Sequence, residues 1–182
     1  SQTVPKQFRF LGSSTGDETI LSRTSSRYQP MDWEELHETI VVKKDLPSLF
    51  RSQQVQDRYV QHRLQIAQTY DSIYDYILNT KFNLPRQWNP QTSRWQVPYN
   101  ASSTSALVAL APNDFPYCTA PGIEHWVLWK LGRDRPITDD DIAQALQTLR
   151  DDHRVTATIH WENPPHLKSL PRIDHYHILA KT

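Results

Sequence analysis

Three short segments in the second half of the chain have the composition of β-strands, and they constrain the fold more than any other feature. They are "IEHWVLWK" (123–130), "RVTATIHW" (154–161) and "IDHYHILAK" (173–181), all rich in β-branched and aromatic residues. Isolated strands are not stable in water, so we expect these segments to pair into a small sheet. Between the first two, "ITDDDIAQALQTLRDDH" predicts a helix with Thr138 as its N-cap and Asp141 completing a capping box.

The first half of the chain has the periodicity of helices. "MDWEELHETI" predicts a short helix with Asp32 as its N-cap. Over residues 52–80, apolar side chains recur at spacings of three and four, which predicts one bent helix, or two helices with Asp71 and Ser72 at the start of the second. We therefore predict an α+β fold, in which a small, mainly antiparallel sheet from the C-terminal half packs against helices of the N-terminal half.

Other stretches lack such a pattern. Residues 1–30 mix Ser, Thr, Gln and Arg without a period and are interpreted as an N-terminal arm, which leaves residues 31–182 as a single domain. Residues 83–100 predict a loop that Trp88 and Trp95 hold against the core, because a long structureless loop is unusual in a compact domain. The apolar run at 105–111 is either a buried strand or the end of a helix.

Composition excludes several classes of protein. The 20 Lys and Arg residues balance the 20 Asp and Glu residues, which argues against a dedicated, charge-driven nucleic-acid-binding protein, although it does not exclude a local basic face. No DNA partner is expected. One cysteine permits neither an internal disulfide nor a thiolate metal cluster. The four glycines include no phosphate-binding loop, so ATP chemistry through such a loop is not expected. Without a long apolar stretch or a signal-peptide core, the chain is predicted to be cytoplasmic and to engage no membrane.

Histidines are concentrated on the strand-like segments. Successive side chains of a strand point to opposite faces, so His175 and His177 share one face of the last segment. If the three segments pair, one face of the sheet gathers His125, His160, His175 and His177. Such a cluster would contain several groups that titrate near neutral pH.

Three kinds of chemistry fit this cluster. A transition metal would take two or three imidazoles and a carboxylate such as Glu124 or Asp174, although no metal motif of defined spacing is present. The "HYH" stretch is similar to part of the motif of histidine-triad nucleotide hydrolases, but Leu179 occupies the third histidine position. The third interpretation is metal-free general acid–base catalysis by Glu124 and one histidine. For each histidine taken alone, a hydrogen-bonded structural role is the alternative.

Two longer segments carry a family resemblance that covers roughly residues 31–182. "NDFPYCTAPGIEHWVLWK" (113–130) and "WENPPHLKSLPRIDHYHILAK" (161–181) resemble the paired signature of a mainly fungal family. Its members have been described as N-acetylglucosamine-induced proteins and as a domain of unknown function, and are identified as arginine-containing cyclodipeptide synthases. The matching positions are Asn113, Asp114, Pro116, Tyr117, Pro121, Gly122, Ile123, His125 and Trp129, then Asn163, Pro164, Ser169, Pro171, His175 and His177.

The resemblance implies a tRNA-dependent enzyme that needs no metal and no cofactor. It would take an arginyl group from Arg-tRNA and a second aminoacyl group, and form cyclo(Arg-Xaa) by ester aminolysis and cyclisation. The ester of the aminoacyl-tRNA would supply the driving force, which agrees with the lack of an ATP-binding loop. On this interpretation residues 31–182 are a single catalytic domain.

Substrate-binding residues follow from what such a reaction must recognise. A guanidinium group favours a planar carboxylate, for which Asp114, Glu124 and Asp174 are the candidates within the motifs. Aromatic side chains add cation–π contacts. The other predicted substrate-binding residues are Tyr117, Trp126, Trp129, His160 and His175.

Catalytic residues are assigned on the same chemical grounds. His125 or His177 suits the role of general base, with Glu124 as its carboxylate partner, and Asn163 is a donor to the developing oxyanion. A covalent route through Ser169, Cys118 or Tyr117 is the alternative.

Basic residues gather between residues 43 and 63. The predicted tRNA-binding residues are Lys43, Lys44, Arg51, Arg58 and Arg63. A solvated helix face is the alternative explanation of this charge. Two other functions for the chain are kept: a non-enzymatic regulatory protein that responds to sugar or nucleotide signals, and a metal-dependent hydrolase that uses the histidine cluster.

Overall fold

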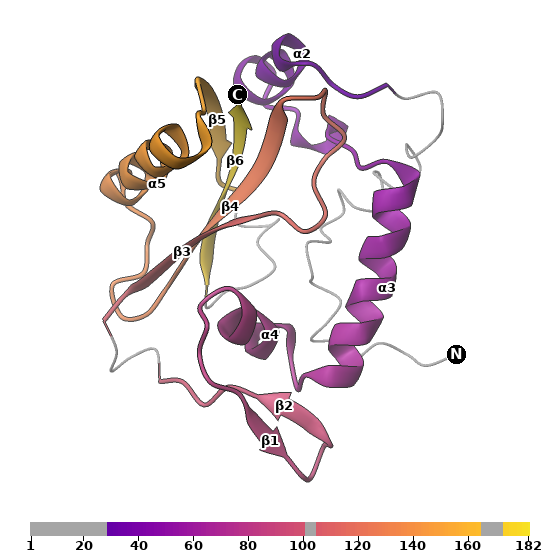
Figure 1. The fold of residues 1–182 in the computed structure, drawn as a ribbon, viewed down its shortest axis with the longest axis vertical. Helices are drawn as coiled ribbons and strands as arrows, with labels where there is room; N and C mark the ends of the chain where they lie inside the picture. The colour runs from indigo at the N-terminus through magenta and orange to yellow at the C-terminus, as the bar shows by residue number, and fades with distance from the viewer. Residues whose placement is uncertain (1–28, 101–104, 165–172) are drawn as a thin grey trace.

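A four-stranded antiparallel sheet from the second half of the chain is the centre of the fold (Figure 1). Its strands are β3 (Leu107–Pro112), β4 (Ile123–Leu131), β5 (Ala157–Trp161) and β6 (Asp174–Lys181), in the spatial order β3-β4-β6-β5. The structure is a computed structural model that describes residues 29–100, 105–164 and 173–182. The α+β class and the antiparallel pairing of the C-terminal segments are confirmed.

Three α-helices precede this sheet in the described part of the chain: α2 (Trp33–His37), α3 (Gln53–Thr69) and α4 (Ile73–Thr80). A π-helical turn at Glu38–Val42 and a 3-10 turn at Leu46–Ser48 lie between α2 and α3. A further helix, α5 (Asp139–His153), lies between β4 and β5. Residues 52–80 form two helices because Tyr70 is extended and the Ser72 hydroxyl caps α4 by accepting from the N–H of Asp75. The predicted caps at Asp32 and Thr138 are confirmed. None of the helices described is long and apolar enough to cross a membrane.

The structure differs from the sequence prediction near residue 154 and within residues 83–100. The strand expected from residue 154 begins at Ala157, because Arg154 adopts the left-handed conformation (φ 56°) that ends α5. The expected loop at residues 83–100 contains a hairpin, in which β1 (Gln87–Asn89) pairs with β2 (Arg94–Gln96).

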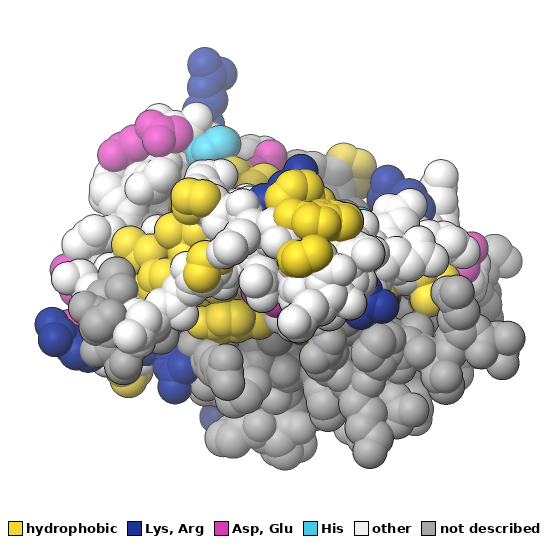
Figure 2. Space-filling view, turned by 90° about the horizontal axis from the view of Figure 1, so that it is seen from below, with side chains coloured by type: hydrophobic (Ala, Val, Ile, Leu, Met, Phe, Trp, Pro, Cys, Tyr) yellow, Lys and Arg dark blue, Asp and Glu magenta, His cyan; other side chains and the backbone are white. Residues whose placement is uncertain are grey.

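A tryptophan pair closes this hairpin. Trp88 lies directly opposite Trp95, and their rings meet edge to face with centroids 5.1 Å apart. The prediction that both tryptophans hold the segment against the core was wrong for Trp88, which is 47% exposed. Figure 2 views the end of the molecule that carries the hairpin and shows hydrophobic side chains gathered among Lys and Arg side chains.

One face of the sheet packs against α5. Trp126, Leu128 and Ile178 form a buried cluster there with Ile142 and Leu149 of the helix. An ion pair joins the same two elements: the side chain of Lys130 donates to Asp141 at 2.6 Å. These contacts hold β4 and β6 against α5.

The opposite face is apolar at its two ends and polar in the middle. At one end, Leu131 and Ile173 join a buried cluster with residues of α4. At the other end, Leu179 joins a second cluster with residues of α2. Because side chains alternate along β6, His175 and His177 share this face and lie between the two clusters. The polar middle of the face borders a pocket.

A substitution of Gly132 tests how closely the chain just after β4 packs against the chain just before β3. Its φ is +118°, and a Cβ added there would lie 2.8 Å from the Cα of Ala106. Gly122, with φ +85°, is the matched control because its added Cβ would meet only the Thr182 side chain, at 3.7 Å. In urea unfolding we expect Gly132→Ala to lower the free energy of unfolding by about 3 kcal/mol and Gly122→Ala by about 1 kcal/mol. Equal losses would contradict the close packing.

Candidate functional site

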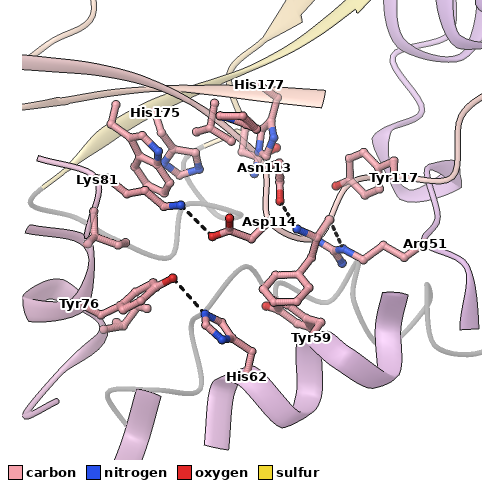
Figure 3. Close-up of a pocket in the computed structure, with 17 residues that line it drawn as sticks. Arg51, Tyr59, His62, Tyr76, Lys81, Asn113, Asp114, Tyr117, His175 and His177 are labelled. Carbon is pink, nitrogen blue, oxygen red and sulfur yellow. Dashed lines mark hydrogen bonds and ion pairs between the residues drawn. The ribbon is translucent and has the colours of Figure 1, made fainter. Parts of the chain in front are cut away.

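A pocket lies between the polar middle of the sheet and helices α3 and α4 (Figure 3). Its volume is about 130 Å³, which is room for a small organic group, since one water needs only about 10–15 Å³. The lining residues are Pro112, Val127, Trp129, His175 and His177 from the sheet, Asn113, Asp114, Phe115 and Tyr117 from the segment after β3, Asn163, and Arg51, Tyr59, His62, Ile73, Tyr76, Ile77 and Lys81 from the helical side.

Two imidazoles on the sheet side form a hydrogen-bonded pair. His125 Nε2 lies 2.9 Å from His177 Nδ1. The other nitrogen of His125, Nδ1, accepts from the backbone N–H of Tyr117 at 3.3 Å. These two hydrogen bonds engage both ring nitrogens of His125, which is 3% exposed, whereas His177 lines the pocket.

Burial keeps both imidazoles neutral. Burial, and then the charge of Arg51, lowers the pKa of His125 from 6.5 to about 3. Burial is also the main reason that the pKa of His177 lies well below its usual value, and His125, His175 and Arg51 act in the same direction. The expectation that this cluster titrates near neutral pH is therefore wrong for the pair. At neutral pH the pair offers N–H groups and lone pairs, but no positive charge.

Aromatic rings surround the pair. Tyr117 stacks on His125 with ring centroids 4.9 Å apart, and Trp161 stacks on His177 at 5.1 Å. The Trp129 ring lies next to that of His175, at 5.2 Å. Trp129 Nε1 is buried and finds no acceptor among the residues that the structure describes. Because buried N–H groups are normally paired, this one is a candidate donor to a ligand.

The helical side of the pocket carries groups of another kind. His62 Nε2 lies 3.0 Å from the hydroxyl of Tyr76, and Lys81 donates to Asp114 at 2.7 Å. Burial, and then the charge of Asp114, raises the pKa of Tyr76 to about 12. Figure 3 shows Lys81 and Asp114 between the imidazoles of the sheet and the His62–Tyr76 pair. The Asp114 side chain is 48% exposed, so its carboxylate is accessible to a ligand.

Arg51 belongs to the pocket and not to the exposed basic surface where the sequence interpretation put it. It directly precedes Ser52, the N-cap residue of α3, and is 5% exposed. Its Nε donates to the carbonyl of Phe115 at 2.9 Å, and its guanidinium lies 4.7 Å over the ring of Tyr59 and 5.2 Å over that of Tyr117. The prediction of Arg51 as an exposed tRNA contact was wrong, and its charge instead favours an electron-rich group in the pocket.

The structure brings many of the predicted site residues together. Those that line the pocket are Arg51, Asp114, Tyr117, Trp129, Asn163, His175 and His177, and His125 is bonded directly to His177. His62, Tyr76, Lys81 and Asn113 also line it but were not predicted. Asn113 lies within the quoted motif, which was a usable signal. No local sequence signal marks the other three, because they meet the sheet only through tertiary packing.

Four predicted site residues lie on the opposite face of the sheet, next to α5. They are Glu124, Trp126, His160 and Asp174. Glu124 accepts from Trp126 Nε1 at 2.9 Å, so it is not the carboxylate partner of a pocket histidine. Asp174 instead lies 3.7 Å from Arg135.

The expectation that His160 shares a face with the other three histidines was wrong. In the register of β5 and β6, Trp161 lies opposite His177, and His160 lies opposite Ile178 on the α5 side. A shift of one residue in register exchanges the faces of every side chain, and the sequence of β5 alone does not determine that register.

Three of the four remaining predicted tRNA contacts are exposed. Lys43, Lys44 and Arg58 are exposed, and Arg63 is half-buried with its guanidinium 5.6 Å from the ring of Tyr59. A groove along α3 is lined by Asp57, Arg58, Gln61, His62, Gln65 and Phe115. It adjoins the pocket, because His62 and Phe115 line both.

The donor set does not suit a metal ion. Within residues 29–100, 105–164 and 173–182, no group of three or more His, Cys, Asp and Glu side chains is arranged to hold one. His125 has both ring nitrogens engaged, and the expected carboxylate ligands Glu124 and Asp174 lie on the other face.

The structure adds no support for a covalent route through the predicted nucleophiles. Burial raises the pKa of the Cys118 thiol, which is the opposite of what activates a cysteine. Tyr117 lines the pocket, and Ser169 lies outside the described residues.

The low pKa of His125 predicts an acid-sensitive fold. Its pKa is about 3 when folded and about 6.5 when unfolded, so between these values the unfolded chain binds more protons. We expect the free energy of unfolding to fall as the pH drops from about 6.5 toward 3, by up to about 1.4 kcal/mol per pH unit from this histidine alone. Urea unfolding across this range, with His125→Gln as the comparison, measures the slope. An NMR titration of His125 with a midpoint near 6.5 would refute it.

Comparisons with known proteins give a family and two relatives. The model of a family described as "Protein of unknown function (DUF3605)" matches residues 32–181. The uncharacterized protein YPL067C of Saccharomyces cerevisiae is 28% identical over 175 residues, which cover 88% of this chain and 83% of the yeast protein. A solved structure described as "Crystal Structure of HTC1" has a TM-score of 0.52 and 25% identity, covering 84% of this chain and 85% of that one.

These findings correct the resemblance drawn from the sequence. The identification with an arginine-containing cyclodipeptide synthase family was wrong, because the family model that covers residues 32–181 is described as one of unknown function. Neither relative's description names an activity. The pocket residues from Arg51 to His177 all fall within the matched region, and the chain belongs to the DUF3605 family of proteins of unknown function.

Proposed function

We propose that the protein is an aminoacyltransferase that takes aminoacyl groups from tRNA and forms arginine-containing cyclodipeptides, cyclo(Arg-Xaa), without a metal or other cofactor. One observation carries the proposal: the pocket presents N–H donors from the sheet and an accessible carboxylate, Asp114, beside them. An aminoacyl ester has a carbonyl oxygen that accepts hydrogen bonds and a cationic amine that favours a carboxylate. The two sets of groups are complementary.

The sheet side of the pocket suits the carbonyl. Trp129 has a buried N–H without an acceptor among the described residues, and the His177 imidazole is neutral and lines the same pocket. Asn163, predicted as an oxyanion donor, lines it as well. Preorganised donors of this kind stabilise the negative charge that develops on a carbonyl oxygen under attack.

Asp114 suits the cationic groups of an arginyl substrate. Its present partner is Lys81, in an ion pair that is partly exposed and therefore worth only about 0–1 kcal/mol. A guanidinium can bind a carboxylate through two parallel hydrogen bonds, which a lysine cannot. The ring of Tyr76 lines the pocket near Asp114 and offers a cation–π surface.

The proposed reaction is two successive ester aminolyses. The ammonium of one aminoacyl group first loses a proton to solvent and becomes a neutral amine. This amine attacks the ester carbonyl of the other aminoacyl group, so that a C–N bond forms and the C–O bond to the tRNA ribose breaks. The proton lost by the amine ends on the leaving ribose oxygen. The free amine of the dipeptidyl ester then attacks its own ester in the same way and closes the six-membered ring. Each ester supplies the energy of one step, and neither step needs ATP.

The tRNA must leave the pocket toward solvent. The groove along α3 supports this path, since it shares His62 and Phe115 with the pocket, and its other lining residues are Arg58, two glutamines and Asp57. Lys43 and Lys44 are exposed and available to phosphates. A cytoplasmic location, where aminoacyl-tRNA is made, is part of the proposal.

The test is product formation by purified protein with tRNA, arginyl-tRNA synthetase, ATP and all amino acids, followed by mass spectrometry. We expect a cyclo(Arg-Xaa) product that disappears when tRNA is left out. Asp114→Asn should lower kcat/KM for the arginyl donor by about 10- to 100-fold, through loss of a charge-assisted hydrogen bond.

Asp174→Asn is the matched control, because this carboxylate lies on the opposite face of the sheet. It should leave kcat/KM within about twofold, as expected for a surface substitution away from the site. No product from folded protein and fully charged Arg-tRNA would refute the proposal. Binding of Arg-tRNA without turnover would favour a binding protein instead.

A further inference from the structure

The hydrogen bonds of His125 determine which of its nitrogens carries the proton. The backbone N–H of Tyr117 can only donate, so Nδ1 of His125 accepts. In a neutral imidazole the proton then sits on Nε2, which donates to Nδ1 of His177 at 2.9 Å.

The side chain of Asn113 does not reverse this assignment. Its Oδ1 accepts from the N–H of Phe115 at 2.8 Å, which turns Nδ2 toward His125. Nδ2 lies 3.4 Å from His125 Nε2 and would donate to it only if Nε2 carried no proton, which the N–H of Tyr117 at Nδ1 opposes and the shorter 2.9 Å contact with His177 disfavours. Asn113 therefore holds the loop after β3, and His177 accepts the hydrogen bond from Nε2–H of His125.

The proton position of His177 follows from that of His125. Since Nδ1 of His177 accepts, its own proton is on Nε2. No acceptor for this N–H occurs in the part of the chain that the structure describes, and the side chain lines the pocket. The chain of bonds thus runs from the Tyr117 backbone through two imidazoles and ends in a donor at the pocket.

We propose that His177 is a fixed hydrogen-bond donor to the carbonyl oxygen of the bound ester, and that His125 is a positioning residue that holds His177 in this form. The inference rests on the proposed function, because it names the group that would contact the reacting carbonyl. When the amine attacks, the carbonyl π electrons move to oxygen, and the N–H of His177 stabilises that charge without giving up its proton. The electron pair then returns to carbon as the C–O bond breaks.

This assignment changes the roles expected from the sequence. A general base needs a lone pair toward the substrate, and Nε2 of His177 carries a proton in this tautomer. His125 has no ring nitrogen open to the pocket. The base role first given to these histidines is therefore replaced by an electrophilic one for His177.

The surroundings disfavour the other protonation states. A proton on Nδ1 of His125 would face the N–H of Tyr117, and a proton on Nδ1 of His177 would face Nε2–H of His125. The groups that lower the pKa of His177 besides its burial are His125, His175 from β6 and Arg51 from before α3, and Tyr117 packs against the pair. The other titratable groups that line the same pocket are His62, Tyr76, Lys81 and Asp114. The positive charge of Arg51 acts against an imidazolium.

Nitrogen NMR of the ¹⁵N-histidine-labelled wild-type protein tests the tautomers directly and needs no substrate. At pH 7 we expect both His125 and His177 as the neutral Nε2–H form, each with one protonated and one unprotonated ring nitrogen. A protonated Nδ1 on His177, a rapid mixture of tautomers, or an imidazolium would overturn the inference.

Two substitutions of His125 then separate positioning from structural support. His125→Gln keeps an acceptor for the Tyr117 N–H and a donor for His177, whereas His125→Leu removes both. We expect His125→Leu to lower kcat about 100-fold with little change in KM, His125→Gln to recover most of this loss, and His177 to titrate closer to 6.5 in the leucine variant.

The outcomes distinguish this inference from the proposed function. Equal losses in the two variants, with an unchanged tautomer of His177, would remove the positioning role of His125. If the leucine variant does not fold, the wild-type tautomers and the activity of His125→Gln still test the inference. A tautomer other than Nε2–H on His177, or a loss of about 100-fold in kcat for His125→Gln, would overturn it. The predicted tautomers without any cyclodipeptide product would support the inference about the imidazole pair and reject the proposed reaction alone.

Discussion

The proton positions in the site depend on the hydrogen bond from the backbone N–H of Tyr117 to Nδ1 of His125. An amide N–H keeps its proton at any pH at which the protein is folded, so this bond sets the proton positions of two consecutive imidazoles. Stacking of Tyr117 on His125 and of Trp161 on His177 opposes rotation of either ring. The result is a donor whose direction and charge are determined by the fold, in surroundings where hydrogen bonds to a developing charge are stronger than in water.

The sheet provides the rigidity that such a donor needs. Its face toward the pocket is anchored by apolar clusters at both ends, and the imidazoles occupy the interval between them. The other face is held by α5 through buried apolar side chains and the ion pair of Lys130 with Asp141. The helical side differs, because the exposed carboxylate of Asp114 and its exchangeable partner Lys81 can respond to a ligand.

The features that could be predicted from the sequence are those set by residues close together in the chain. The alternation within β6 correctly assigned His175 and His177 to one face, and the caps at Asp32 and Thr138 are set by residues only three positions apart. Relations between distant segments were not predictable in the same way. The face of His160 depends on the register between β5 and β6, and the burial of Arg51 depends on how α3 packs over the loop after β3. The approach of His62 and Tyr76 to the pocket likewise exists only in the folded chain.

A crystal structure with an unreactive analogue of arginyl-tRNA, a 3′-amide-linked arginyl adenosine, tests the central claim most directly. The account predicts that the acyl oxygen lies about 2.7–3.1 Å from Nε2 of His177, with Nε1 of Trp129 as the second donor, and that a cationic group of the arginyl moiety binds Asp114. An analogue bound outside the pocket, or one whose carbonyl points away from His177, would contradict it.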